Sequence, residues 1–170
     1  MASLRLTKSA QIWGMDLVVG VIIFSVSLGI FYIFTLNDSG LSSEKVESLS
    51  NVGKIISNSI LSEGSPVNWD SSNVLEIGIF SDGKINETKL ESFYNLAVVD
   101  YPRTKIMFNS GYDYYFFLDD SMNISSKVVD GIGKPGVNRD NISSENLIKI
   151  SRIVPYKGKL TNARIYVWGK

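Results

Sequence analysis

Few side chains in this sequence could carry out chemistry, because it contains no cysteine and no histidine. Thiolate nucleophiles, imidazole bases, Cys/His zinc sites and disulfides are therefore excluded. Serine, lysine, tyrosine and the carboxylates remain, but neither G-x-S-x-G nor S-x-x-K with its partner motifs occurs. We therefore expect a protein that is not an enzyme, with no catalytic residue and no cofactor.

A glycine-rich segment is the first candidate ligand site. Residues Gly131 to Gly136 match the letters of the dinucleotide motif G-x-G-x-x-G. That motif requires a strand before it and a helix that opens at its end. Pro135 lies inside the segment, and Val137 to Asp140 do not resemble the start of a helix. The sequence therefore predicts a glycine-rich loop and not a nucleotide site.

A polar segment is the second candidate. Asp119, Ser121 and Asn123 alternate as the oxygen ligands of a calcium loop do. An EF-hand loop would continue with Gly and place Glu at its twelfth position, where this chain has Ile124 and Asp130. A polar turn after a strand explains the same residues, and we predict no metal site.

Candidate glycosylation sites form a third group. Four asparagines are followed two residues later by Ser or Thr, namely Asn37, Asn86, Asn123 and Asn141. Such sequons are modified on surfaces outside the cytoplasm. For Asn86 the alternative role is that of a helix cap.

A long apolar segment explains why the mean hydropathy is +0.08 although 20% of the residues are charged. The stretch from Leu17 to Leu36 has no charged residue. At about 1.5 Å per residue it spans about 30 Å, the thickness of a bilayer core. Residues 11–37 are therefore predicted to form a transmembrane helix. Because Arg5 and Lys8 precede it, we expect a single-pass protein of the cell membrane, with a cytoplasmic N-terminus and an extracellular C-terminal domain.

The residues before the apolar segment carry a more specific signal. Lys8, Ser9, Ala10 and Gln11 are followed by five residues ending in Asp16, and the apolar run then begins. This pattern resembles the class III signal peptide of archaeal type IV pilin-like proteins. The resemblance implies that a prepilin peptidase removes residues 1–10 as a basic leader by cutting between Ala10 and Gln11. It also implies a structural role in a surface filament, with membrane lipid and other copies or related pilin-like subunits as partners.

Three residues are candidates for assembly of such a filament. A carboxylate costs about 2.5–3.5 kcal/mol at the bilayer centre and less at its edge, so Asp16 could be matched there by a neighbour's N-terminal ammonium. The alternative is that Asp16 lies in the first helical turn, where the helix dipole favours an acid. Ser25 and Gly29 form a small-xxx-small pair that permits close approach of helices in lipid.

The rest of the chain predicts an α+β fold. Asn37 to Gly40 have turn chemistry, and residues 38–66 are expected to hold an amphipathic helix from about Ser43 to Leu61. Its apolar positions are Val46, Leu49, Val52, Ile56 and Ile60. We expect this helix to pack on a small antiparallel sheet, as the outer half of the long helix does in pilins.

Residues 67–170 are expected to form the extracytoplasmic domain. Predicted strands are Val74 to Phe80, Tyr112 to Leu118, Leu147 to Tyr156 and Leu160 to Trp168, the last two as a hairpin. Additional short helices are predicted after Asn86 and from Pro102.

The charge balance limits the partners. With 17 basic and 17 acidic residues, the chain offers no long-range field for nucleic acid, and we expect no nucleic-acid partner. The alternative to a pilin-like subunit is an uncleaved single-pass protein whose extracytoplasmic domain binds a ligand or acts as an accessory protein.

Overall fold

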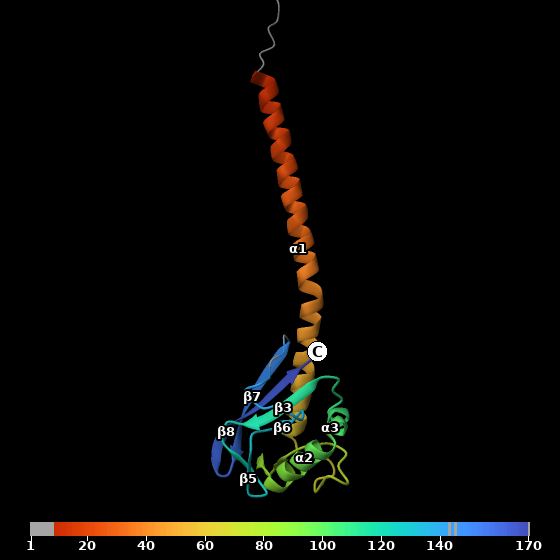
Figure 1. The fold of residues 1–170 in the computed structure, drawn as a ribbon, viewed down its shortest axis with the longest axis vertical. Helices are drawn as coiled ribbons and strands as arrows, with labels where there is room; N and C mark the ends of the chain where they lie inside the picture. The colour runs from red at the N-terminus through yellow and green to blue at the C-terminus, as the bar shows by residue number, and fades with distance from the viewer. Residues whose placement is uncertain (1–8, 143, 145, 170) are drawn as a thin grey trace, which may run out of the picture. The chain divides into compact units, whose positions relative to one another are not determined.

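The computed structural model describes residues 9–142, 144 and 146–169. The chain divides into a first unit that ends at Glu44 and a second that begins at Lys45. Its helices are α1 (Ser9–Ile60), α2 (Glu87–Val99) and α3 (Tyr101–Met107) (Figure 1). Its strands are β1 (Phe80–Ser81), β2 (Lys84–Ile85), β3 (Asp113–Leu118), β4 (Met122–Ile124), β5 (Lys127–Val129), β6 (Ile132–Gly133), β7 (Leu147–Tyr156) and β8 (Lys159–Trp168). The chain is therefore a mixture of helices and antiparallel sheets with an apolar helix near its N-terminus.

Helix α1 continues where the sequence predicts a turn. The backbone of Asn37 to Gly40 is helical, so the expected start of a second helix near Ser43 is wrong. Turn-forming residues disfavour a helix interior by only about 1 kcal/mol or less each, and none of these four is proline. The predicted end of the helix is correct to one residue, because α1 ends at Ile60 and Gly64 adopts a positive φ of 72°.

The main sheet has four strands in the order β6-β3-β8-β7. The β7–β8 pair runs from Leu147 opposite Trp168 to Tyr156 opposite Lys159. The two residues between the strands, Lys157 and Gly158, have φ values of 51° and 76°. Positive φ at both turn positions suits the right-handed twist of a hairpin, so the predicted hairpin is confirmed.

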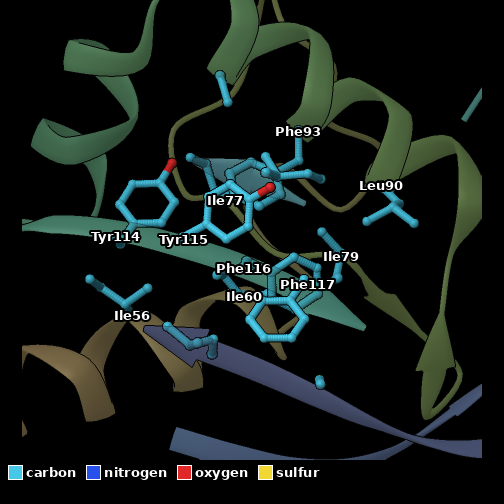
Figure 2. Close-up of a cluster of buried hydrophobic side chains, with 14 of the residues drawn as sticks. Ile56, Ile60, Ile77, Ile79, Leu90, Phe93, Tyr114, Tyr115, Phe116 and Phe117 are labelled. Carbon is cyan, nitrogen blue, oxygen red and sulfur yellow. The ribbon is translucent and has the colours of Figure 1, made fainter. Parts of the chain in front are cut away.

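Helices cover one face of this sheet. A Cβ on Gly53 of α1 would lie 2.7 Å from Ile150 of β7 and 3.6 Å from Val167 of β8. Phe93 of α2 lies 6.4 Å from Tyr114 of β3, measured between ring centroids. Figure 2 shows the resulting cluster, which includes Ile56, Ile60, Leu90, Phe93, Tyr114 and Phe116. The apolar stripe predicted for α1 is thus buried at Leu49, Ile56 and Ile60, whereas Val46 remains 45% exposed.

The segment after β5 covers the opposite face. Tyr115 and Phe117 are each only 4% exposed, and the Arg139 guanidinium lies 5.2 Å from the ring centre of Phe117. The Tyr115 hydroxyl donates to Asp130 over 2.9 Å. Strand β3 is therefore buried on both faces, and its aromatic residues are core residues, as predicted.

The strand expected from Val74 to Phe80 is wrong for most of its length. Val74, Ile77 and Ile79 are buried as their apolar character predicts, but only Phe80 belongs to a strand. The backbone amide of Ile79 instead donates to the carbonyl of Ile60, the last residue of α1, over 2.8 Å. The segment thus satisfies a free carbonyl at a helix end, which local sequence patterns cannot reveal.

The first of the two short helices begins at its predicted cap, and the second begins one residue before the predicted start at Pro102. The Asn86 side-chain oxygen accepts hydrogen bonds from the amides of Thr88 and Lys89 at the start of α2. Asp100 caps α3 in the same way, with Pro102 in the first turn. Short strands β4, β5 and β6 were not predicted, because two or three residues are too few to show periodicity.

Two glycines with the same backbone conformation test how tightly the second unit is packed. Gly64 and Gly83 have φ values of 72° and 73°, but only at Gly64 would a Cβ meet other atoms, with Glu76 O at 2.7 Å. Gly83→Ala should lower the free energy of unfolding by about 1–2 kcal/mol, the cost of the left-handed conformation. Gly64→Ala should cost about 1–3 kcal/mol more through overpacking. Denaturant unfolding of the full chain in detergent measures both, and equal losses would contradict the described packing.

Candidate functional site

The apolar part of α1 is the most distinctive surface of the first unit. The helix from Gly14 to Thr35 is long and apolar enough to cross a membrane, and none of it is buried. Its large apolar side chains are exposed: the exposed fraction is 71% for Leu17, 67% for Phe24 and 70% for Phe34. A continuous apolar helix of this length is stable only where another apolar phase or another protein surrounds it.

The residues at the predicted processing site lie at the start of α1. Ser9, Ala10 and Gln11 have helical backbone, and Lys8 lies outside the described residues. Asp16 is exposed and lies seven residues after the first residue of α1. The alternative role of Asp16 as an acid in the first turn is therefore wrong for this helix.

The small residues proposed for helix association face open space. A Cβ added at Gly29, like one at Gly14 or Gly20, would meet no atom within 4 Å. Ser25, four residues before Gly29, is exposed as well. Both positions of the small-xxx-small pair are therefore unobstructed in the first unit, as close approach of another helix would require.

The glycine-rich segment has no nucleotide-binding geometry. Gly133 belongs to β6, the edge strand beside β3, and no helix opens after Gly136. The Lys134 ammonium lies 2.7 Å from an oxygen of Asp113 and is thus held by a carboxylate. A shallow hollow of about 190 Å³ lies between this loop and α2, with Tyr94, Val98 and Pro135 in its lining. The predicted loop is therefore correct only in part, because Ile132 and Gly133 form β6 and the turn begins after them.

In the polar turn after β3, Asp119 forms an ion pair with Arg164. Both carboxylate oxygens of Asp119 are bound, with Arg164 Nε 2.7 Å from one and Asn162 Nδ2 2.9 Å from the other. These bonds lower the pKa of Asp119. Among the described residues no group of three acidic, His or Cys side chains could hold a metal ion. Asp119 therefore fastens the turn to β8.

Comparison with protein-family models, with curated proteins and with solved structures found no match to this chain.

Sequence reasoning missed a charged cluster at the start of β3. Asp113 lies 3.0 Å from Lys105 Nζ and 2.7 Å from Lys134 Nζ, and the Tyr101 hydroxyl donates to it over 3.2 Å. Burial raises the pKa of Asp113, but the hydrogen bonds and charges of the two lysines outweigh burial and leave the pKa lowered. Within the local sequence, the one sign of this cluster is that an acid, Asp113, stands at the start of an aromatic strand.

The described sequons differ in exposure and in hydrogen bonding. Asn123 is exposed in β4 and Asn141 is exposed in the loop before β7, whereas Asn86 is partly buried at the start of α2. The structure does not describe the side chain of Asn37, the fourth sequon residue.

The Asp113 cluster predicts a specific loss of stability in acid. Because its pKa is lower in the folded chain, the stabilisation is present above the ordinary aspartate pKa of about 4 and is lost as the pH falls below it. Thermal unfolding of Asp113→Asn should therefore vary less with pH between about 2 and 5 than that of the wild-type chain. Asp120→Asn, a change at an exposed acid, serves as the control and should keep the wild-type slope. An unchanged slope in Asp113→Asn would exclude this linkage.

Proposed function

We propose that this protein is a structural subunit of a type IV pilus-like or related surface filament. Its apolar helix first anchors it in the membrane and then joins a bundle of like helices. The cytoplasmic leader, residues 1–10, is removed by a prepilin peptidase. The second unit faces outward and carries no active site.

The exposure of the helix from Gly14 to Thr35 carries this proposal. None of this helix is covered within the chain, so its cover must come from lipid or from other chains. Arg5 and Lys8 stand before it, as in a leader on the cytoplasmic side. A soluble domain would instead bury such a helix in its own core.

The second unit supports the same proposal. Residues 45–60 of α1 supply Leu49, Ile56 and Ile60 to the core. Arg152 of β7 lies 3.4 Å from the Ser57 hydroxyl of the same helix, and the Tyr112 hydroxyl lies 3.1 Å from that of Ser48. A helix fixed to an antiparallel sheet by apolar and polar contacts is the arrangement expected for the outer part of a pilin-like subunit.

The alternative is an uncleaved single-pass protein whose outer domain binds a ligand or partner. The hollow beside α2 is the observation that favours it, because a few aromatic and glycine residues line it. This protein would keep residues 1–10 and would not enter a filament. The two proposals therefore differ at the N-terminus.

The proposal predicts the N-terminus of the mature chain. Protein purified from the membrane or surface of its own cell should begin at Gln11, which an intact mass and an N-terminal peptide map will show. Lys8→Glu should slow the removal of the leader, whereas Lys45→Glu, a control far from the junction, should leave it unchanged. A mature chain that retains Met1 to Ala10 would exclude the processed subunit and leave the single-pass alternative.

The proposal also predicts a role for Asp16 in assembly. In a bundle of helices this carboxylate is matched by a neighbour's new N-terminal ammonium, so Asp16→Ala should lower filament incorporation about tenfold, equivalent to about 1.4 kcal/mol. Asp38→Ala, which changes an acid beyond the apolar segment, should assemble normally. Sedimentation and electron microscopy of sheared surface filaments measure the effect. Normal assembly of Asp16→Ala with normal processing would show that the carboxylate has another role.

A further inference from the structure

The three sequons whose asparagine side chains are described differ in what their side-chain amides already do. At Asn86 the oxygen accepts bonds from the amides of Thr88 and Lys89, at 3.0 and 3.2 Å. Its Nδ2 donates to the Ser81 hydroxyl over 3.3 Å, and the residue is partly buried. This amide closes the N-terminus of α2 and joins it to the β1–β2 hairpin. Linking a sugar to its nitrogen would disturb that junction.

Asn141 is also engaged within its loop. Its side-chain oxygen accepts from the amide of Asn138 over 2.8 Å, and its Nδ2 lies 3.4 Å from the carbonyl of Gly136. These contacts hold the turn that leads from the glycine-rich loop to the residues before β7. Asn141 is more exposed than Asn86 but its amide is not free of protein contacts.

Asn123 has the opposite environment. It lies in the middle of β4, and its neighbours Met122 and Ile124 are 1% and 4% exposed. Because side chains alternate along a strand, burial of both neighbours turns Asn123 to the outside of the β4–β5 pair. It is exposed, and its side-chain amide makes no hydrogen bond within the described part of the chain.

The third sequon residue is accessible as well. Ser125 and Ser126 form the two-residue turn between β4 and β5, with φ values of 48° and 65°, and both are exposed. The Ser125 hydroxyl contacts the carboxylate of Glu91 at the surface of α2. The Asn123 amide thus faces the outside of one short hairpin and the exposed Ser125 lies in its turn, so a modifying enzyme can reach both residues without unfolding the domain.

We propose that Asn123, among the described sequons, carries an N-linked glycan and that Asn86 stays unmodified as a helix cap. The donor is an oligosaccharide linked to a lipid phosphate. The Asn123 Nδ2 bonds to the anomeric carbon of the sugar as the bond from that carbon to the phosphate oxygen breaks. The lipid phosphate leaves with the electron pair of that bond, and Nδ2 loses one proton.

The glycan has a physical use at this position. Val128 of β5 lies directly across from Asn123 and is 74% exposed. Cross-strand neighbours on one face of a pair lie about 5 Å apart at their Cβ atoms, so the first sugar residues cover this valine. Modification at Asn123 therefore hides an apolar side chain, whereas modification at Asn86 would break hydrogen bonds.

The inference rests on the proposed extracellular position of the second unit. It is tested on full-length protein extracted from its own cell by intact mass and glycopeptide mapping. The wild-type chain should carry a glycan on the peptide that contains Asn123 and none on the peptide that contains Asn86. Asn123→Gln should lose one glycan mass and keep its melting temperature, whereas Asn86→Gln should keep the glycan and melt at a lower temperature.

A matched pair at the turn separates the sequon from the hairpin. Ser125→Ala removes the sequon hydroxyl and should abolish the glycan, whereas Ser126→Ala changes the neighbouring turn residue, also at positive φ, and should retain it. A bare Asn123 in a chain that starts at Gln11 would overturn this inference alone. A bare Asn123 in a chain that keeps its leader would overturn both proposals, and a glycan on Asn86 would contradict the role assigned to its cap.

Discussion

Burial of β3 on both of its faces is the constraint on which the second unit depends. Tyr114 and Phe116 pack against Phe93 of α2, and the Tyr114 hydroxyl donates to Thr104 of α3, while Tyr115 and Phe117 contact Asp130 and Arg139 on the other face. An antiparallel sheet in a small domain commonly leaves one face to water, but five large apolar side chains in a row cannot do so at low cost. Both a helical layer and a covering loop are therefore required. The helices precede β3 in the chain, and the covering segment follows β5.

This double burial determines where the polar groups lie. Asp113 stands at the first position of β3, where the sheet meets solvent, and two lysines compensate it. On the covered second face, Asp130 binds both the Tyr115 hydroxyl and Arg139, so the buried hydroxyl has a partner and the loop is fixed to the sheet. Lys89 is only 5% exposed, and its ammonium donates to the carbonyls of Glu63 and Phe80. Each charge near the core thus joins two segments that are distant in sequence.

The first unit follows a different rule, because its apolar residues have no cover within the chain. The same residue types that are buried in the second unit, such as Ile and Phe, are 56–70% exposed between Ile30 and Phe34. In water this surface would be unstable, whereas in lipid or in a bundle of helices it is the stabilising surface. In the proposed filament function, lipid surrounds this helix before assembly and a bundle of like helices surrounds it afterwards.

The sequence by itself determined the elements whose signals are local. The apolar helix, the cap at Asn86, the aromatic strand and the β7–β8 hairpin follow from periodicity, capping chemistry and turn residues within short windows. Tertiary structure alone decided that Ile79 would bind the last residue of α1 instead of a neighbouring strand, and that Asp113 would bind Lys105 and Lys134. It also decided that Asn123, among the described sequons, would be exposed and without a side-chain hydrogen bond. The physical reason is that hydrogen-bond partners and exposure depend on residues far away in the chain, which no local pattern records.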